Sequence, residues 1–238
     1  MMNTTFCSGF NALYNRNKYL VKFTMMVITF TVTLFGFCNP TIASNWYVDN
    51  AAVGSKNGTS WQNAWTTFSS IVWGSNGVKS GDILFISGGS SGKTYNSPLN
   101  IGASGTSDIS RITIRVGQDP GHDGAVTITG NGSRYNLINA DSRHYITIDG
   151  SVGNSRRLKV YNTSNGGDDA GILVMSANHF VIRNLEIEKV GIGIYATYGT
   201  GGVIQNCYLH DVRGDAGIRF NARNFSVTPT YDLTIVEY

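Results

Sequence analysis

The sequence is poor in cysteine, proline and charge. It has 3 Cys and 4 Pro among 238 residues, and 14% of its residues are charged. Cys7 and Cys38 lie near the N-terminus, so Cys207 is the one thiol of the remaining chain. One thiol excludes a disulfide framework and a cysteine-ligated zinc site. The formal net charge of +3 is too small to indicate a nucleic-acid partner, and none is predicted.

Several catalytic motifs are also missing. The sequence has no Gly-x-Ser-x-Gly nucleophile elbow and no phosphate-binding glycine loop. His122, His144 and His179 do not follow the spacing of metal ligands. Basic and aromatic residues do not cluster into a nucleic-acid-binding surface. These absences remove serine hydrolases of that type and P-loop proteins from consideration.

The longest apolar run is N-terminal and short. Basic residues up to Lys22 precede the run 23–37, and small residues follow around Ala43. This order is typical of a secretory signal. The run has about 15 residues, fewer than the roughly 20 that a spanning helix needs. We therefore predict a signal peptide over 1–43, a secreted protein, and no membrane insertion after its removal. The alternative is an uncleaved membrane anchor.

What the chain does contain is a repeat. The decapeptide 181–190 returns 22 residues later as 203–212, with apolar residues, Asn and charged residues in matching places. Gly171-Ile172 similarly returns as Gly193-Ile194 and Gly217-Ile218. A period in the low twenties, made of short alternating strands, predicts stacked rungs. Glycine is frequent (29 residues), which favours many turns.

The rungs are expected to fill most of one domain, 44–238. A helix is predicted over 60–73, because four large apolar residues fall at helical spacing there. It would cap the first rung within a segment of about 46–80. Regular rungs follow over about 82–227, interrupted by an insertion within 151–169 that forms either a plain loop or one wall of a groove. The pattern decays before Tyr238, which we interpret as a truncated version of a longer protein.

These repeats resemble a known family. The pieces Tyr145–Gly150, Val181–Leu185, Val203–Cys207 and the Gly-Ile elements are similar to rungs of right-handed parallel β-helix proteins of the pectin-lyase-like superfamily. The resemblance covers about 46–227. It implies an all-β, right-handed parallel β-helix (a solenoid) with an N-terminal capping helix. The superfamily holds polysaccharide lyases, glycoside hydrolases, esterases, epimerases, tailspikes and adhesins, so the fold does not choose among activities.

The repeat also assigns structural roles. Ile182 is expected to stack on Ile204, and Leu185 on Cys207, in apolar columns. Cys207 is therefore interpreted as a small buried residue rather than a reactive thiol. Asn184 and Asn206 fall at a turn, where Asn tolerates left-handed backbone and can bond its neighbour's amide.

Asp168 and Asp169 are the sharpest candidates for chemistry. The stretch 167–172 faintly resembles the paired-Asp motif of polygalacturonases, in which two aspartates act as acid and base. The family's His-containing glycine motif is absent one rung later, and Asp169 recurs as Asp215, so Asp169 also fits a purely structural role. Calcium is a candidate cofactor at the same two aspartates.

A groove is predicted on the outward column Leu173, Tyr195 and Arg219, where an aromatic ring can hold a sugar and an Arg can bind a carboxylate. Glu186 over Tyr208 and Glu188 over His210 also point outward, and the last pair is either a proton-transfer pair or a surface ion pair.

We therefore predict a monomer that binds or degrades polysaccharide, of lyase or glycoside hydrolase type if active. The alternative is a non-catalytic surface or adhesive module.

Overall fold

The computed structural model describes residues 43–132, 136–162, 169–214, 216–221 and 232–236. Almost all of the predicted signal peptide, and the end of the predicted regular rungs beyond 221, lie outside these ranges or at their edge. Within the described ranges, no helix is both long and apolar enough to span a membrane. The signal peptide and the secreted location stay predictions.

The described chain is almost entirely parallel β-structure, in three ladders of paired strands. The first ladder consists of β1 (Asn45–Val48), β2 (Ile83–Ile86), β5 (Ile112–Val116), β8 (Ile146–Asp149), β13 (Val181–Arg183) and the first half of β16 (Val203–His210). The second consists of β3 (Lys93–Tyr95), β6 (Val126–Thr129), β11 (Leu158–Tyr161), β14 (Leu185–Glu188), the second half of β16 and β18 (Asp232–Val236). The third consists of β4 (Leu99–Asn100), β7 (Ile138–Asn139), β12 (Ala170–Leu173), β15 (Ile192–Thr197) and β17 (Ala216–Asn221).

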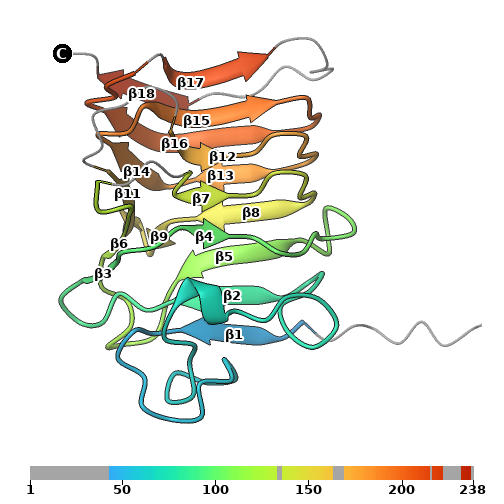
Figure 1. Cartoon of the computed structure of the whole chain (residues 1–238), viewed down its shortest axis with the longest axis vertical. Helices are drawn as coiled ribbons and strands as arrows, with labels where there is room; N and C mark the ends of the chain where they lie inside the picture. Colours follow the sequence, from blue (N-terminus) through green and yellow to red (C-terminus); the bar gives the residue numbers. More distant parts are fainter. Residues whose placement is uncertain (1–42, 133–135, 163–168, 215, 222–231, 237–238) are drawn as a thin grey trace, which may run out of the picture. The chain divides into compact units, whose positions relative to one another are not determined.

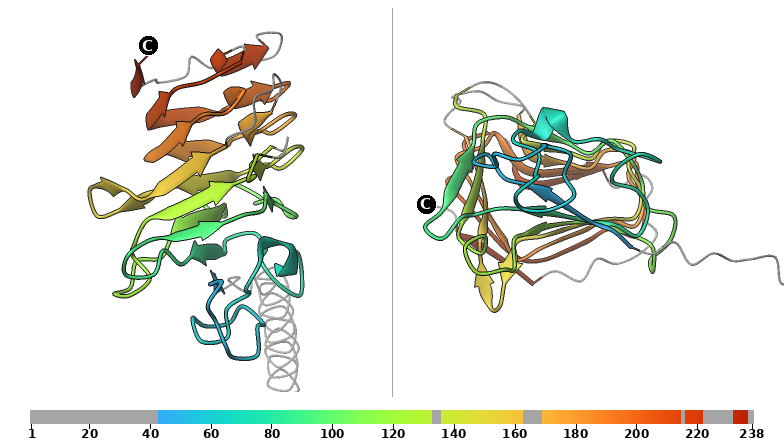
Figure 2. Two further views of the ribbon diagram at one scale, coloured as in Figure 1. Left: turned by 60° about the vertical axis from the view of Figure 1, so that its left-hand side comes forward. Right: turned by 90° about the horizontal axis from the view of Figure 1, so that it is seen from below.

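The chain visits the three ladders in a fixed order. From β2 onward it passes from the first to the second and then the third ladder before returning to the first. Strand β16 is long enough to belong to the first and second ladders at once, which joins them into one 11-stranded sheet. Figure 1 shows the strands stacked in chain order from β1 to β17. Seen from below, the ladders lie around a common interior (Figure 2).

The strand register confirms the columns predicted from the repeat. Ile182 pairs with Ile204 in the first ladder, and Ile187 pairs with Leu209 in the second. In the third ladder Ile172, Ile194 and Ile218 follow one another. The 34-residue step from Ile148 to Ile182 is also confirmed. The 22-residue period therefore reports strand pairing directly.

Inward side chains from all three ladders form one apolar core. Each strand contributes alternate residues, as a pleated strand with one buried face requires. The following examples are at most 1% exposed: Leu84, Ile114, Ile148 and Ile182 from the first ladder, Leu158, Ile187 and Leu209 from the second, and Ile138, Ile172 and Ile194 from the third. Burial of this kind, worth about 25 cal/mol per Å² of apolar area, is the main stabilising contribution.

The Gly-Ile element has a packing explanation. A Cβ on Gly193 would lie 2.2 Å from the carbonyl oxygen of Gly217 and 2.7 Å from Cδ2 of Leu209. A Cβ on Gly171 would lie 2.9 Å from Cγ2 of Ile187. The third ladder therefore packs so closely against the second that only glycine fits before these isoleucines.

The predicted capping helix over 60–73 is wrong. The segment holds a single 3-10 turn, η1 (Phe68–Ser70), and is otherwise loop. Trp65 instead pairs with the first strand: its N–H donates to the Tyr47 carbonyl, and its carbonyl accepts from the N–H of Asp49. Paired serines and threonines also make 60–73 a weak helix former. Long-range backbone pairing therefore overrides the helical spacing of the apolar residues.

The segment still covers the end of the core. Trp65 and Phe68 are 2% and 3% exposed. The ring of Trp65 stacks on Trp46 at 5.3 Å between centroids, and Phe68 stacks on Tyr95 at 4.9 Å. Val72, predicted to share their face, is 44% exposed.

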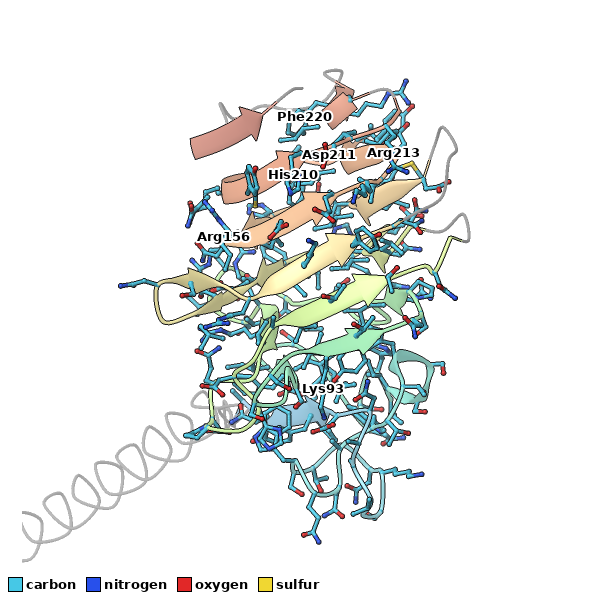
Figure 3. All side chains as sticks on the ribbon, turned by 90° about the vertical axis from the view of Figure 1, so that its left-hand side faces the viewer. Lys93, Arg156, His210, Asp211, Arg213 and Phe220 are labelled. Atoms are coloured by element: carbon cyan, nitrogen blue, oxygen red, sulfur yellow. The ribbon has the colours of Figure 1, made fainter. Side chains whose placement is uncertain are left out.

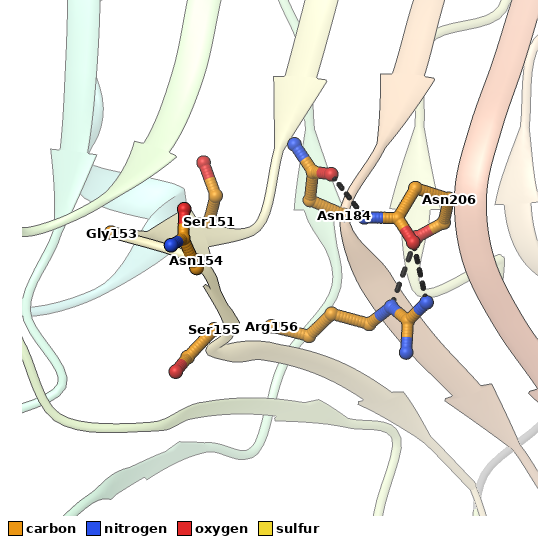
Figure 4. A pocket seen from close by; sticks show the side chains of 7 residues that line it. All are labelled: Ser151, Gly153, Asn154, Ser155, Arg156, Asn184 and Asn206. Carbon is orange, nitrogen blue, oxygen red and sulfur yellow. Dashed lines mark hydrogen bonds between the residues drawn. The ribbon is translucent and has the colours of Figure 1, made fainter.

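The predicted insertion begins with an antiparallel hairpin, β9 (Ser151–Val152) and β10 (Ser155–Arg156). The next residues, β11, rejoin the second ladder. The hairpin, Asn184 and Asn206 line a hollow of about 300 Å³ (Figure 4). Arg156 closes it by donating from Nε to the Asn206 carbonyl at 3.0 Å. Of the two alternatives for the insertion, the structure favours the wall of a hollow.

Candidate functional site

The two predicted aspartates stay untested. Asp168 lies outside the described residues. Asp169 precedes β12, is 8% exposed, and accepts a backbone hydrogen bond from Ile192 through its carbonyl. Their catalytic and calcium-binding roles therefore remain predictions.

The predicted column Leu173, Tyr195 and Arg219 does form. The three residues are register neighbours on β12, β15 and β17. The guanidinium carbon of Arg219 lies 5.5 Å from the centroid of the Tyr195 ring. Leu173 is only 8% exposed, so Tyr195 and Arg219 supply the accessible part of this column. Its role in substrate binding stays a prediction.

A second group of side chains meets on the outer face of the second ladder. Lys159, Glu186, Glu188 and His210, which we name the Glu–His cluster, come from β11, β14 and β16. Nε2 of His210 lies 3.2 Å from Oε1 of Glu186 and 3.3 Å from Oε2 of Glu188. Nζ of Lys159 lies 3.1 Å from Oε1 of each glutamate. The predicted Glu188–His210 pair therefore exists, but within a larger network.

The charges of this cluster reinforce one another. Burial works to raise the pKa of Glu186, but hydrogen bonds from His210 and Lys159 outweigh it and hold that pKa below its ordinary value. Burial likewise opposes the charge of Lys159, and the two glutamates nevertheless raise its pKa. Both groups are therefore charged near neutral pH.

Aromatic rings and further charges flank the cluster. Tyr208 stacks on His210 at 4.4 Å between ring centroids. Nζ of Lys189 lies 5.5 Å from the centroid of the Tyr161 ring. Oδ2 of Asp211 lies 3.2 Å from Nδ1 of His210, on the side of the imidazole away from the glutamates. Figure 3 labels His210 and Asp211 at the end of β16.

A third group lies on the outer face of the first ladder. Register partners on five successive strands are Tyr47, Phe85, Arg115, Asp149 and Arg183. We name this column, together with Trp61 beside it, the aromatic–arginine strip. The rings of Tyr47 and Phe85 stack at 5.9 Å, and Trp61 meets Tyr47 edge-on at 4.6 Å. None of these ring side chains is fully buried.

The polar half of the strip borders a hollow of about 360 Å³. Arg111, Arg115, Arg183 and Asp149 line it, with two threonines between them. Nε and an Nη of Arg183 each lie 3.0 Å from Oδ2 of Asp149. Nε of Arg115 is buried, lies 4.0 Å from the same oxygen, and makes no hydrogen bond to any described residue. The hollow thus presents guanidinium groups with spare donor capacity.

The charge of Asp149 is held in place by its neighbours. Burial works to raise the pKa of Asp149, but hydrogen bonds from Asn184 and Ser151 and the charge of Arg183 lower it. The carboxylate therefore keeps Arg183 in a fixed position at neutral pH.

A Ser–His–Asp group that the sequence does not reveal is not a catalytic triad. Oγ of Ser87 lies 2.9 Å from Nδ1 of His122, and Oδ2 of Asp49 lies 3.4 Å from the same nitrogen. A triad needs the hydroxyl and the carboxylate on opposite ring nitrogens. Ser87 is also fully buried, and Lys93 is already paired with Asp49. The group is structural.

Sequence reasoning missed the aromatic–arginine strip as a unit. Its members are spread over 47–183, and the intervals between them are irregular because loops of different length separate the strands. The available signal was alternation: each lies at an outward position of a predicted strand. Without the register, these positions cannot be aligned.

Comparison with known proteins gives one likeness. No protein-family model matches the sequence. No curated protein matches it. Among solved structures, the chain is similar to the GH136 lacto-N-biosidase from Eubacterium ramulus, with a TM-score of 0.51 and 13% sequence identity. The match covers 70% of this chain and 34% of that one, so this chain spans about a third of the length of that structure. At this identity the likeness concerns the fold alone.

Proposed function

We propose that this protein is a secreted right-handed parallel β-helix protein of the pectin-lyase-like kind, and that it binds a carbohydrate polymer through the aromatic–arginine strip. The fixed order in which the chain visits three parallel ladders supports a β-helix. The likeness to a glycoside hydrolase structure supports it as well, and is consistent with a role in carbohydrate association.

The strip is the observation that carries the proposal. Aromatic faces stack on the apolar faces of sugar rings, and Phe85 and Tyr47 offer such faces on neighbouring strands. Arg115 and Arg183 follow on the same column and offer guanidinium donors to hydroxyl or carboxylate oxygens. Strands in a sheet are about 4.8 Å apart, so five strands span about 19 Å, the length of several sugar units.

Binding to a panel of neutral and acidic polysaccharides tests the proposal. Affinity electrophoresis or calorimetry should detect binding, and Phe85→Ala and Arg115→Ala should each weaken it about tenfold or more. Tyr195→Ala and Arg219→Ala on the third ladder are the matched controls, because they remove the same residue types from the groove predicted from sequence. Loss in these controls, with no loss in the strip variants, would move the binding site to the third ladder.

Turnover separates an enzyme from a non-catalytic module. The Glu–His cluster already satisfies both glutamates with Lys159 and His210, which favours binding without turnover. New reducing ends would indicate a glycoside hydrolase, and a rise in ultraviolet absorbance from an unsaturated product would indicate a lyase. Binding with neither signal would support the adhesive or surface module.

A further inference from the structure

We infer that Glu186, Glu188 and His210 form a binding site for a divalent transition metal ion, with Zn²⁺ as the best match to its ligands. One ligand atom from each of the three residues can be chosen such that all lie within 4.8 Å of one another. The site lies on the second ladder and is independent of the carbohydrate-binding proposal, which uses the first.

The spacing of the ligand atoms fits zinc. Zinc in proteins binds nitrogen and carboxylate oxygen at about 2.0–2.2 Å with tetrahedral geometry, which places two ligands about 3.3–3.5 Å apart. Nε2 of His210 lies 3.2 Å from Oε1 of Glu186 and 3.3 Å from Oε2 of Glu188. Two edges of a tetrahedral site are therefore present before any ion binds. One imidazole and two carboxylates leave a fourth position open for water.

Asp211 orients the imidazole for this role. A metal-bound histidine usually donates its other ring N–H to a carboxylate. Oδ2 of Asp211 lies 3.2 Å from Nδ1 of His210, so the proton of a neutral imidazole is favoured at Nδ1. The lone pair of Nε2 then points between the two glutamates. A proton or a metal ion must occupy that space, since three electron-rich atoms would otherwise face one another.

The charge balance leaves room for a cation. Three carboxylates, from Glu186, Glu188 and Asp211, meet two lysines, Lys159 and Lys189. One negative charge is left for an imidazolium or a metal ion to neutralise. Lys159 contacts Oε1 of Glu188, whereas His210 faces Oε2 of the same side chain. Lys159 can therefore keep one partner when a metal binds, although it competes for Glu186.

Burial distinguishes this group from an ordinary surface ion pair. The side chains of Glu188 and His210 are only 12% and 13% exposed. They are held by parallel strands rather than loops, and Tyr208 stacks on the imidazole. Ligands that are fixed and partly desolvated lose little freedom when they bind an ion.

Zinc titration of the chelator-treated protein, purified without a histidine tag, tests the site. We expect one Zn²⁺ per chain by calorimetry or by competition with a zinc indicator. Co²⁺ in the same site should give the visible absorption of a tetrahedral complex. His210→Ala and Glu188→Gln should each weaken binding tenfold or more, and Asp211→Asn should weaken it about tenfold. Lys159→Met should tighten binding, because it removes a competing cation.

His179→Ala is the matched control. Nδ1 of His179 lies 3.6 Å from Oδ2 of Asp108, so it is also a histidine beside a carboxylate, but it is not part of the three-ligand group. Binding should survive this change. Each variant is checked by circular dichroism and thermal melting, and Glu188→Gln serves if His210→Ala does not fold. The inference is overturned if neither wild type nor Lys159→Met binds zinc stoichiometrically, or if binding survives both His210→Ala and Glu188→Gln.

Discussion

Nδ2 of Asn206 donates a hydrogen bond to Oδ1 of Asn184 across 2.7 Å, from one repeat to the one before it. Asn184 donates in turn to Oδ1 of Asp149 at 2.9 Å, so the ladder continues into a third strand. Both asparagines have left-handed backbone, with φ of 58° for Asn184 and 49° for Asn206. The pair predicted from the repeat is therefore confirmed. It holds the corner between the first and second ladders.

Replacing Asn184 with Leu should destabilise the protein. The change breaks two side-chain hydrogen bonds, leaves Asp149 with one donor fewer, and puts a branched side chain into left-handed backbone. We expect a loss of about 1–3 kcal/mol in the free energy of unfolding. Asn184→Gly keeps the backbone easy to form while removing the hydrogen bonds, so it should cost less. A thermal melt unchanged in both variants would contradict a structural role for the ladder.

Gly193→Ala should cost much more stability than Gly217→Ala. The added methyl at 193 meets the carbonyl oxygen of Gly217 at 2.2 Å, whereas at 217 the nearest atom, Cδ2 of Leu209, is 3.9 Å away. Overpacking of this kind costs about 1–3 kcal/mol. Urea denaturation of the two variants measures the difference. Equal midpoints would show that the third ladder can move away from the second.

Stability should fall as the pH drops below about 4. The pKa values of Asp49, Asp149 and Glu186 lie below their ordinary values: burial raises each of them, and hydrogen bonds with nearby positive charge lower them further. A lowered pKa stabilises the folded state above the unfolded-state pKa, and this is lost as the pH falls through the folded-state value. Urea denaturation between pH 7 and pH 2 measures the loss. Asp149→Asn should be less stable at pH 7 and should show a shallower acid dependence; an identical slope would exclude a contribution from Asp149.

Cys207 should be inert in the folded protein. It is fully buried in the core, and burial raises the pKa of its thiol to about 11. Maleimide should label the native protein at neutral pH far more slowly than the protein in guanidinium, because the thiolate is the reactive form. Rapid stoichiometric labelling of the native protein would instead indicate an accessible, reactive thiol.

The repeat was sufficient to predict the strand pairing. Ile182 and Ile204 are 22 residues apart and pair directly, because a ladder of parallel strands keeps equivalent residues in equivalent places. The buried state of Cys207 followed from the same alignment. Helical spacing failed over 60–73, because the backbone of Trp65 bonds β1, and such a pairing has no local signature.

The candidate sites divide in the same way. The sequence placed Tyr195 with Arg219, and Glu188 with His210, since each pair is separated by about one period. It could not place Lys159 beside Glu186, because a hairpin interrupts the period between them, nor Arg115 beside Arg183, because the intervening loops vary in length. Asp168 and Asp169 stay predictions.

By itself the sequence determined the parallel β-architecture, the inward columns and the asparagine corner, because these depend on alternation and on a constant interval along the chain. Only the tertiary structure decided which outward side chains meet across irregular intervals. Those contacts depend on the register of strands joined by loops of unequal length. The aromatic–arginine strip and the arrangement of Asp211, His210 and the two glutamates arise at that level.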